Sequence, residues 1–255
     1  MRTTMDAIRE HKAKVLEHYA ESQLLGIFVY GSQNYSIATE TSDVDTKAIL
    51  VPTLEELCLG KPVSRELHLD NEEHCEVKDI RELVKMFRKQ NINFLEILYT
   101  DYCWINPKYN RLWREYFVNN REKISHMDMR VALMSICGQA IHTLKQNKTD
   151  GKKFSNGLRL YHTLKKYIEG ENYDKCIDMI FHEKGLAEKL ISYKKNLIPV
   201  MEDEVDDLIG KFLWIESIAE QYPKVPDSEA SRILDEGILA LVTNDNITFD
   251  FYKNK

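Results

Sequence analysis

The chain has 255 residues and a formal net charge of −6, with 43% hydrophobic and 30% charged residues. This length allows one large domain or two small ones with a substantial core. The composition excludes a disordered chain, and the low Gly and Pro content of 10 and 6 residues disfavours collagen-like, low-complexity and loop-dominated all-β proteins. We therefore expect a soluble, helix-rich protein.

Charge is unevenly distributed along the chain. The negative total argues against a nucleic-acid binder that depends on an overall positive field. However, residues 145–166 carry seven Lys or Arg and one acid, whereas residues 167–255 hold 19 acids and 10 bases. The basic stretch is either a solvated helix face or a surface that binds phosphates, and the sequence leaves both interpretations open.

The cysteines and the N-terminus indicate the cellular compartment. Five widely spaced cysteines without a C-x-x-C pair predict neither a disulfide framework nor a zinc site. Residues 1–20 are charged throughout, and no apolar run approaches the roughly 18 residues that a membrane span needs. We expect a cytoplasmic protein without membrane contact. The amino-acid sequence does not indicate an oligomeric state.

The first 77 residues are predicted to mix helices and strands. An amphipathic helix is expected within residues 1–20, and the apolar run at 24–30 is typical of a buried strand. A second strand is predicted at 43–51, before Pro52, followed by a short helix at 53–59. One or two further strands are expected within 67–77.

The remainder of the chain is predicted to be mainly helical. A helix begins after Asp79, which serves as its cap. Further helical patterns cover 94–99, 112–118, 131–144, 158–168, 208–218 and 233–241. The predicted organisation is an α/β half, residues 1–104, followed by an all-helical half, residues 105–255.

Two carboxylates begin the second predicted strand. Alternation along a strand puts Asp43 and Asp45 on one face and Val44 in the core. Two neighbouring carboxylates repel strongly where water cannot screen them. A hard divalent cation with oxygen ligands, such as Mg²⁺, would relieve this repulsion.

A third acid is predicted by the same alternation. In the segment from His74 to Lys78, the residues Cys75 and Val77 form the apolar face, so Glu76 lies on the polar face. Asp79 has the opposite parity and is explained by its capping role. Glu72 and Glu73 are expected to be solvated in a turn.

Other residues are candidates for holding phosphates. Gly31 permits a close approach of the backbone, and Ser32 offers a hydroxyl at the end of the first strand. Four basic side chains are further candidates for binding phosphates. Lys47 and Lys78 either contact phosphates or form structural ion pairs, and Lys153 and Arg159 either contact phosphates or belong to a solvated surface.

These motifs resemble the DNA polymerase β-like nucleotidyltransferase superfamily. The segments YGSQNYSIATETSDVDTKAILVP and EVKDIRELVKMFRKQNINFLEILYT are most similar to predicted bacterial and phage nucleotidyltransferases associated with RNA repair. The resemblance covers residues 25–104. In the helical half, only KKFSNGLRLYHTLKKYIEG is similar to a family helix.

The resemblance implies an α+β protein with a small mixed-sheet palm domain at 1–104 and an all-helical acceptor-binding domain at 105–255. It implies that Gly31 and Ser32 bind a nucleoside triphosphate, and that Asp43 and Asp45 hold two Mg²⁺ ions, with Mn²⁺ as an alternative. Glu76 would complete the triad, although the superfamily commonly has Asp there.

The implied reaction transfers a nucleoside monophosphate from an NTP, such as ATP, to an acceptor hydroxyl and releases pyrophosphate. An RNA 3′ end, for example of tRNA, is the preferred acceptor. Two alternatives stay open at this point: transfer to a protein or to a small molecule such as an antibiotic, and a non-catalytic, antitoxin-like module that binds NTP.

Overall fold

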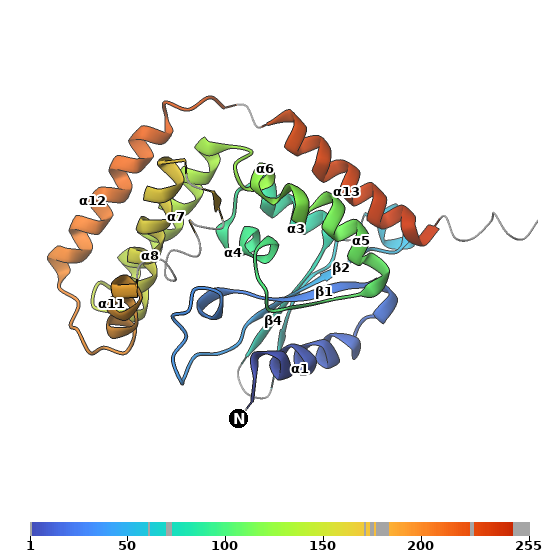
Figure 1. Cartoon of the computed structure of the whole chain (residues 1–255), viewed down its shortest axis with the longest axis horizontal. Coiled ribbons are helices and arrows are strands. Elements are labelled where there is room, and N and C mark those ends of the chain that lie inside the picture. Colours follow the sequence, from blue (N-terminus) through green and yellow to red (C-terminus); the bar gives the residue numbers. More distant parts are fainter. Residues whose placement is uncertain are drawn as a thin grey trace, which may run out of the picture.

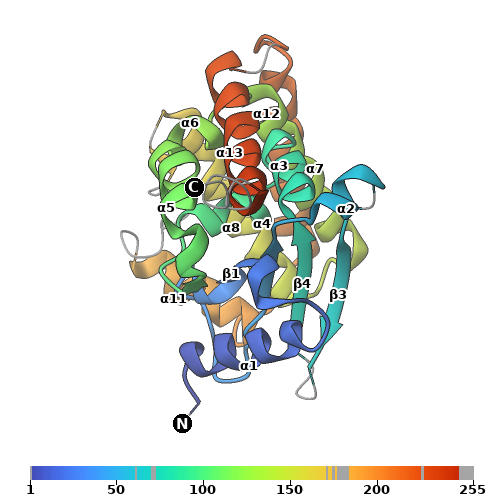
Figure 2. The same cartoon turned by 90° about the vertical axis from the view of Figure 1, so that its right-hand side faces the viewer.

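The computed structural model describes residues 2–60, 62–69, 73–170, 172, 173, 176, 184–224 and 227–246. Within them the chain is a mixed α+β protein, as predicted, with one five-stranded sheet and many helices. Figure 1 shows one helix below the sheet, a group of helices above it and a second group beside it. Figure 2 shows the same layers after a quarter turn.

The sheet combines antiparallel and parallel pairs. Its strands are β1 (Leu24–Val29), β2 (Thr46–Leu50), β3 (Ser64–His68), β4 (His74–Asp79) and β5 (Cys103–Ile105). Their order is β3-β4-β2-β1-β5, and only the pair of β2 and β4 is parallel. The strand predicted at 24–30 is confirmed, whereas β2 starts three residues later than predicted. The pattern also missed β5, which has only three residues.

Helix α1 (Thr4–Leu16) covers one face of the sheet (Figure 1). Thr3 and Asp6 form a capping box at its start. Ala7, Ile8 and Val15 are its apolar stripe, and they belong to one buried cluster with strand residues of β1, β2 and β4. The helix predicted for residues 1–20 is thus present and amphipathic.

The opposite face packs against a second layer of helices. These are α3 (Ile80–Arg88), α4 (Ile92–Leu95), α5 (Pro107–Tyr116), α6 (Arg121–Ser125) and α13 (Ser228–Asn246). Asp79 caps α3 through hydrogen bonds to the amides of Arg81 and Glu82, as predicted. Phe28 of β1 packs against Trp113 of α5, with 5.2 Å between ring centroids. Aromatic side chains therefore join the sheet to the helical layer.

The remaining long helices lie beside the sheet. They are α7 (Met129–Gln146), α8 (Gly151–Ile168), α11 (Lys184–Lys194) and α12 (Glu202–Ala219), while short α2 (Leu54–Cys58) follows β2. Single 3₁₀ turns occur at Glu21–Gln23, Gly31–Gln33, Glu96–Leu98 and Val118–Asn120. One hydrophobic cluster continues from the sheet through these helices to α13. The boundary predicted after residue 104 falls inside β5, and the two-domain division stays a prediction.

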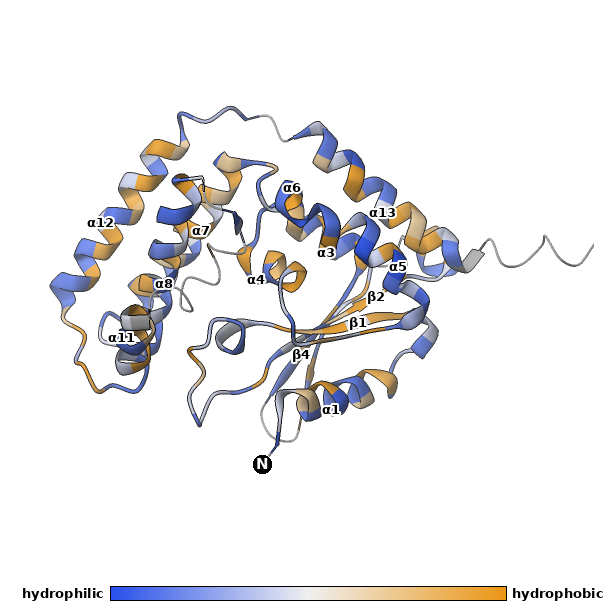
Figure 3. Ribbon diagram, viewed as in Figure 1, coloured by the Kyte–Doolittle hydropathy of each residue, from blue (hydrophilic) through white to orange (hydrophobic). Residues whose placement is uncertain are grey.

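Apolar residues concentrate in the strands and on the inward sides of the helices (Figure 3). β1 is buried along its whole length. Among the helices of the described ranges, none has both the length and the apolar composition that crossing a bilayer requires.

We predict that Phe28→Ala destabilises the fold by about 3–5 kcal/mol, because it leaves a cavity where β1 meets Trp113. The phenyl ring is 1% exposed. Urea unfolding measures the change. Leu213→Ala, at a position 51% exposed, is the control and is expected to change stability by no more than about 0.5 kcal/mol. Equal effects of the two substitutions would contradict the proposed junction.

Candidate functional site

The predicted pair of carboxylates lies immediately before β2. Val44 is buried in the cluster beneath α1, and its neighbours Asp43 and Asp45 both line one cleft with a volume of about 580 Å³. The alternation inferred from the sequence therefore holds, although Asp43–Asp45 are not part of the strand itself. The side chain of Asp43 is exposed and that of Asp45 is half-buried.

A buried carboxylate holds this segment in place. Glu73 accepts hydrogen bonds from the amide of Val44 at 3.1 Å and from the two terminal nitrogens of Arg2 at 2.6 Å each. Its Oε2 is also 3.0 Å from Nε2 of His11, whose Nδ1 is 2.7 Å from the hydroxyl of Thr46. The prediction that Glu73 is solvated was wrong, because it is 4% exposed and ties α1 to the start of β2.

The surroundings of Asp45 disfavour its charged form. Oδ1 of Asp45 accepts a hydrogen bond from the amide of His74 at 3.2 Å. Burial raises the pKa of Asp45; His74 opposes this rise, and the charges of Asp43 and Glu73 add to it. A divalent ion between Asp43 and Asp45 would offset their repulsion, and their oxygen donors suit Mg²⁺. The predicted ligand pair therefore fits such an ion.

The loop that follows β1 forms the neighbouring part of the cleft. Gly31 has a φ of +82°, a conformation that favours glycine, and there is open space where a side chain would begin. Its amide donates a hydrogen bond to Oε1 of Glu96 at 3.0 Å, and the hydroxyl of Tyr35 donates to Oε2 of the same carboxylate. The buried Glu96 thus holds the loop so that Gly31 and Ser32 line the cleft.

Basic side chains from the helical half also line the cleft. They come from the first turns of α8 and the end of α11, namely Lys152, Lys153, Arg159, Lys194 and Lys195. Lys194 donates to the hydroxyl of Ser42 at 2.8 Å, next to Asp43. The pattern did not single out Lys194 or Lys195, because no motif connects them with residues some 150 positions earlier.

Arg159 is the most buried of these bases, at 4% exposure. Its guanidinium lies 3.9 Å from the centre of the Tyr35 ring, and Nη2 donates to Asn156 at 2.8 Å. The other terminal nitrogen, Nη1, has no hydrogen-bond partner within the described residues. Because a buried donor without a partner is costly, an anionic ligand in the cleft is a suitable partner for Nη1.

Three predicted residues lie outside the cleft lining. Nζ of Lys47 is 2.6 Å from Glu76 and lies over the rings of Tyr30 and Phe94. Lys78 also pairs with Glu76, at 3.2 Å. Burial opposes ionisation of Glu76, but the two lysines outweigh it, and the pKa of Glu76 is lowered. The role of Glu76 as a third catalytic acid stays a prediction, and so does the binding of phosphate by Lys47 and Lys78.

The cleft therefore brings together six of the nine residues predicted for the site: Gly31, Ser32, Asp43, Asp45, Lys153 and Arg159. Its volume is in the usual range for small-molecule sites, about 300–1,000 Å³. The carboxylates of Asp43, Asp45 and Asp150 line the cleft together with four lysines and Arg159. Such a site can hold a polyanion between a carboxylate-bound cation and fixed positive charges.

No protein-family model matches this chain, and no curated protein sequence matches it.

Glu96→Gln is expected to change how stability depends on pH. Burial raises the pKa of Glu96 above its ordinary value of 4.5, although Tyr35 and Arg159 act against this rise. The carboxyl group therefore contributes its full stability below about pH 4.5, and this contribution is lost as the pH rises through the raised pKa. The variant keeps an oxygen acceptor but does not titrate.

Urea unfolding of both proteins between about pH 4 and about pH 8 tests this prediction. As the pH rises, the wild type should lose stability relative to Glu96→Gln, so that the unfolding free energy of the variant minus that of the wild type increases. Parallel pH curves would contradict the assignment of a raised pKa to Glu96.

Proposed function

We propose that this chain is a Mg²⁺-dependent nucleotidyltransferase that transfers a nucleoside monophosphate from an NTP to an acceptor hydroxyl. The observation that carries the proposal is the charge arrangement of the cleft. Asp43 and Asp45 line it just before β2, and Lys152, Lys153 and Arg159 line it from α8, whose cap Asp150 is also at the cleft. This arrangement suits a triphosphate that is bound to a divalent cation.

Each residue then has a defined task. Arg159 and Lys153 hold the phosphates, and Ser32 contributes a hydroxyl beside the open space over Gly31. Mg²⁺ held by Asp43 and Asp45 would lower the pKa of the acceptor hydroxyl and neutralise the leaving pyrophosphate. The acceptor oxygen forms a bond to the α-phosphorus as the bond to the bridging oxygen breaks. Pyrophosphate and a proton are released.

An RNA 3′ end is the acceptor that we favour. Support comes from the basic stretch 145–166, of which Lys152, Lys153 and Arg159 line the cleft. Lys148 instead pairs with Asp206 on α12 at 2.6 Å, so only part of the stretch is directed to the site. An RNA that reaches the cleft would pass the same bases that hold the triphosphate, which makes its affinity strongly dependent on salt.

One observation favours a second candidate function, NTP binding without transfer. The predicted third acid, Glu76, is neutralised by Lys47 and Lys78 instead of lining the cleft. A site with two carboxylates can still bind a nucleotide and its metal ion. Calorimetric binding of NTP, together with no release of pyrophosphate for any acceptor, would favour this candidate.

We predict that Asp43→Asn combined with Asp45→Asn lowers transfer of labelled nucleotide to tRNA by at least about a thousandfold, because two-metal catalysis supplies several kcal/mol. The assay contains labelled NTP, Mg²⁺ and tRNA. Asp203→Asn removes an exposed acid from α12 and serves as the control, with transfer unchanged. Equal labelling by the double variant and the wild type would overturn the proposal.

Arg159→Gln is expected to weaken NTP binding about tenfold to a hundredfold, because one charge-assisted hydrogen bond contributes about 1.5–3 kcal/mol. Equilibrium binding of a labelled NTP measures the change. Arg232→Gln is the matched control, since Arg232 is exposed and pairs with Glu236 at 2.6 Å. An unchanged dissociation constant in Arg159→Gln would remove Arg159 from the proposed phosphate site.

A further inference from the structure

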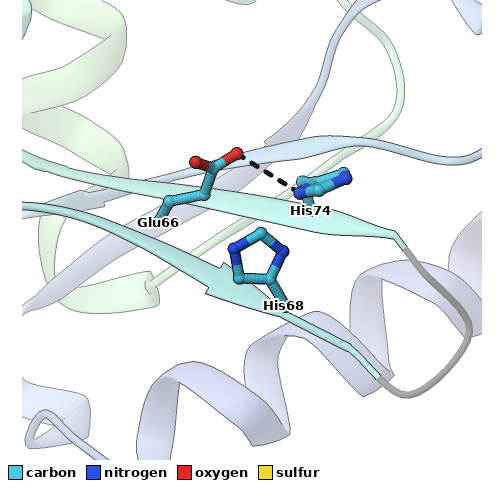
Figure 4. A group of neighbouring side chains, drawn as sticks. All are labelled: Glu66, His68 and His74. Carbon is cyan, nitrogen blue, oxygen red and sulfur yellow. Dashed lines mark ion pairs between the residues drawn. The ribbon is translucent and has the colours of Figure 1, made fainter.

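Three metal-binding side chains converge at one edge of the sheet, outside the proposed nucleotide cleft. In the antiparallel pair of β3 and β4, His68 lies directly opposite His74. Glu66 is two residues before His68 and therefore shares its face. Figure 4 shows the carboxylate of Glu66 and the two imidazole rings turned toward one another. Their ligand atoms all lie within 4.8 Å of one another.

One donor-atom distance within this cluster suits a shared ion. Oε1 of Glu66 is 3.2 Å from Nδ1 of His74. This contact is an ion pair only when the imidazole is protonated. Nδ1 is shielded from solvent, and no residue of the described ranges is a partner for it in hydrogen-bonding geometry. Two ligands on one tetrahedral ion, with bonds of about 2.0–2.2 Å, lie about 3.3 Å apart. The observed spacing of the two atoms is therefore that of neighbouring metal ligands.

We infer that Glu66, His68 and His74 form a Zn²⁺ site with three protein ligands and an open position for water. Imidazole nitrogen with one carboxylate is a donor set that Zn²⁺ uses in catalytic sites, whereas Mg²⁺ prefers oxygen ligands alone. Cysteine spacing could not predict such a site, because none of its ligands is a cysteine. The inference does not depend on nucleotidyl transfer.

The position of the cluster gives the ion a structural consequence. β3 is an edge strand, and Leu67 is its only buried residue. A Zn²⁺ ion that bridges β3 and β4 would fasten this weakly packed strand to the sheet. The backbone amide of His74 also donates to Asp45 at 3.2 Å. The same ion would therefore stabilise the position of His74, whose amide donates to Asp45 in the cleft.

Zinc titration of the full chain, prepared without a polyhistidine tag, tests the inference. Competition with a chromophoric chelator should give one Zn²⁺ per chain at this site, with binding retained in excess Mg²⁺. Even outer-shell partners of a metal contribute about tenfold to a hundredfold in affinity. We therefore expect Glu66→Gln, His68→Ala and His74→Ala each to weaken Zn²⁺ binding at least about tenfold.

Two controls separate this site from other parts of the molecule. His18→Ala removes an exposed histidine elsewhere and should leave the Zn²⁺ affinity unchanged. Asp43→Asn with Asp45→Asn should also retain it, which keeps the result independent of the proposed nucleotidyltransferase. Circular dichroism checks the folding of each variant, and His68 and Glu66 are exposed, so their substitution should be tolerated.

Amide hydrogen exchange gives a second readout that does not depend on affinity alone. Zn²⁺ should slow exchange in β3 of the wild type and have no such effect in Glu66→Gln with His68→Ala. Equal Zn²⁺ affinity of that double variant and the wild type would overturn the inference. So would Zn²⁺ binding that is abolished by the Asp43 and Asp45 substitutions but not by those of the cluster.

Discussion

The buried carboxylate of Glu73 is the constraint on which the candidate site depends. A carboxylate that is 4% exposed needs strong partners, because burial of an unpaired charge is costly. Arg2, His11 and the amide of Val44 meet this need. Their convergence ties the N-terminal segment and α1 to the residues between the two aspartates. The helix therefore does more than cover the sheet, since His11 on α1 contacts the carboxylate that binds the amide between the two aspartates.

The second constraint is the meeting of two distant segments at the cleft. Asp43 and Asp45 belong to the segment that enters β2, whereas Asp150, Arg159 and the lysines belong to α8, α11 and the residues directly beside them. Arg159 stacks on Tyr35, and Tyr35 donates to Glu96, which also holds the amide of Gly31. This chain of contacts joins the loop after β1 to α8. One continuous hydrophobic cluster includes residues of both the sheet and α8, and it fixes the positions of these two elements relative to each other.

Glu76 illustrates how far strand alternation can be used to assign a role. Alternation places Glu76 on the polar face of β4, opposite Lys47 of β2 in the parallel register. The lysine side chain is 2% exposed, and its Nζ lies over the rings of Tyr30 and Phe94. It needs a carboxylate partner there, and Glu76 provides one. Strand parity predicts the face of a side chain but not which charged neighbour it meets.

Local pattern by itself determined the main elements of this protein. Apolar periodicity and capping chemistry are properties of neighbouring residues. They account for the strand at 24–30, the helix capped by Asp79 and the burial of Val44 between Asp43 and Asp45. Only the tertiary structure decided the burial of Glu73, the contact of Lys194 with Ser42, and the cluster of Glu66, His68 and His74. Each depends on residues brought together by packing or by strand register, and local periodicity carries no information about those distances.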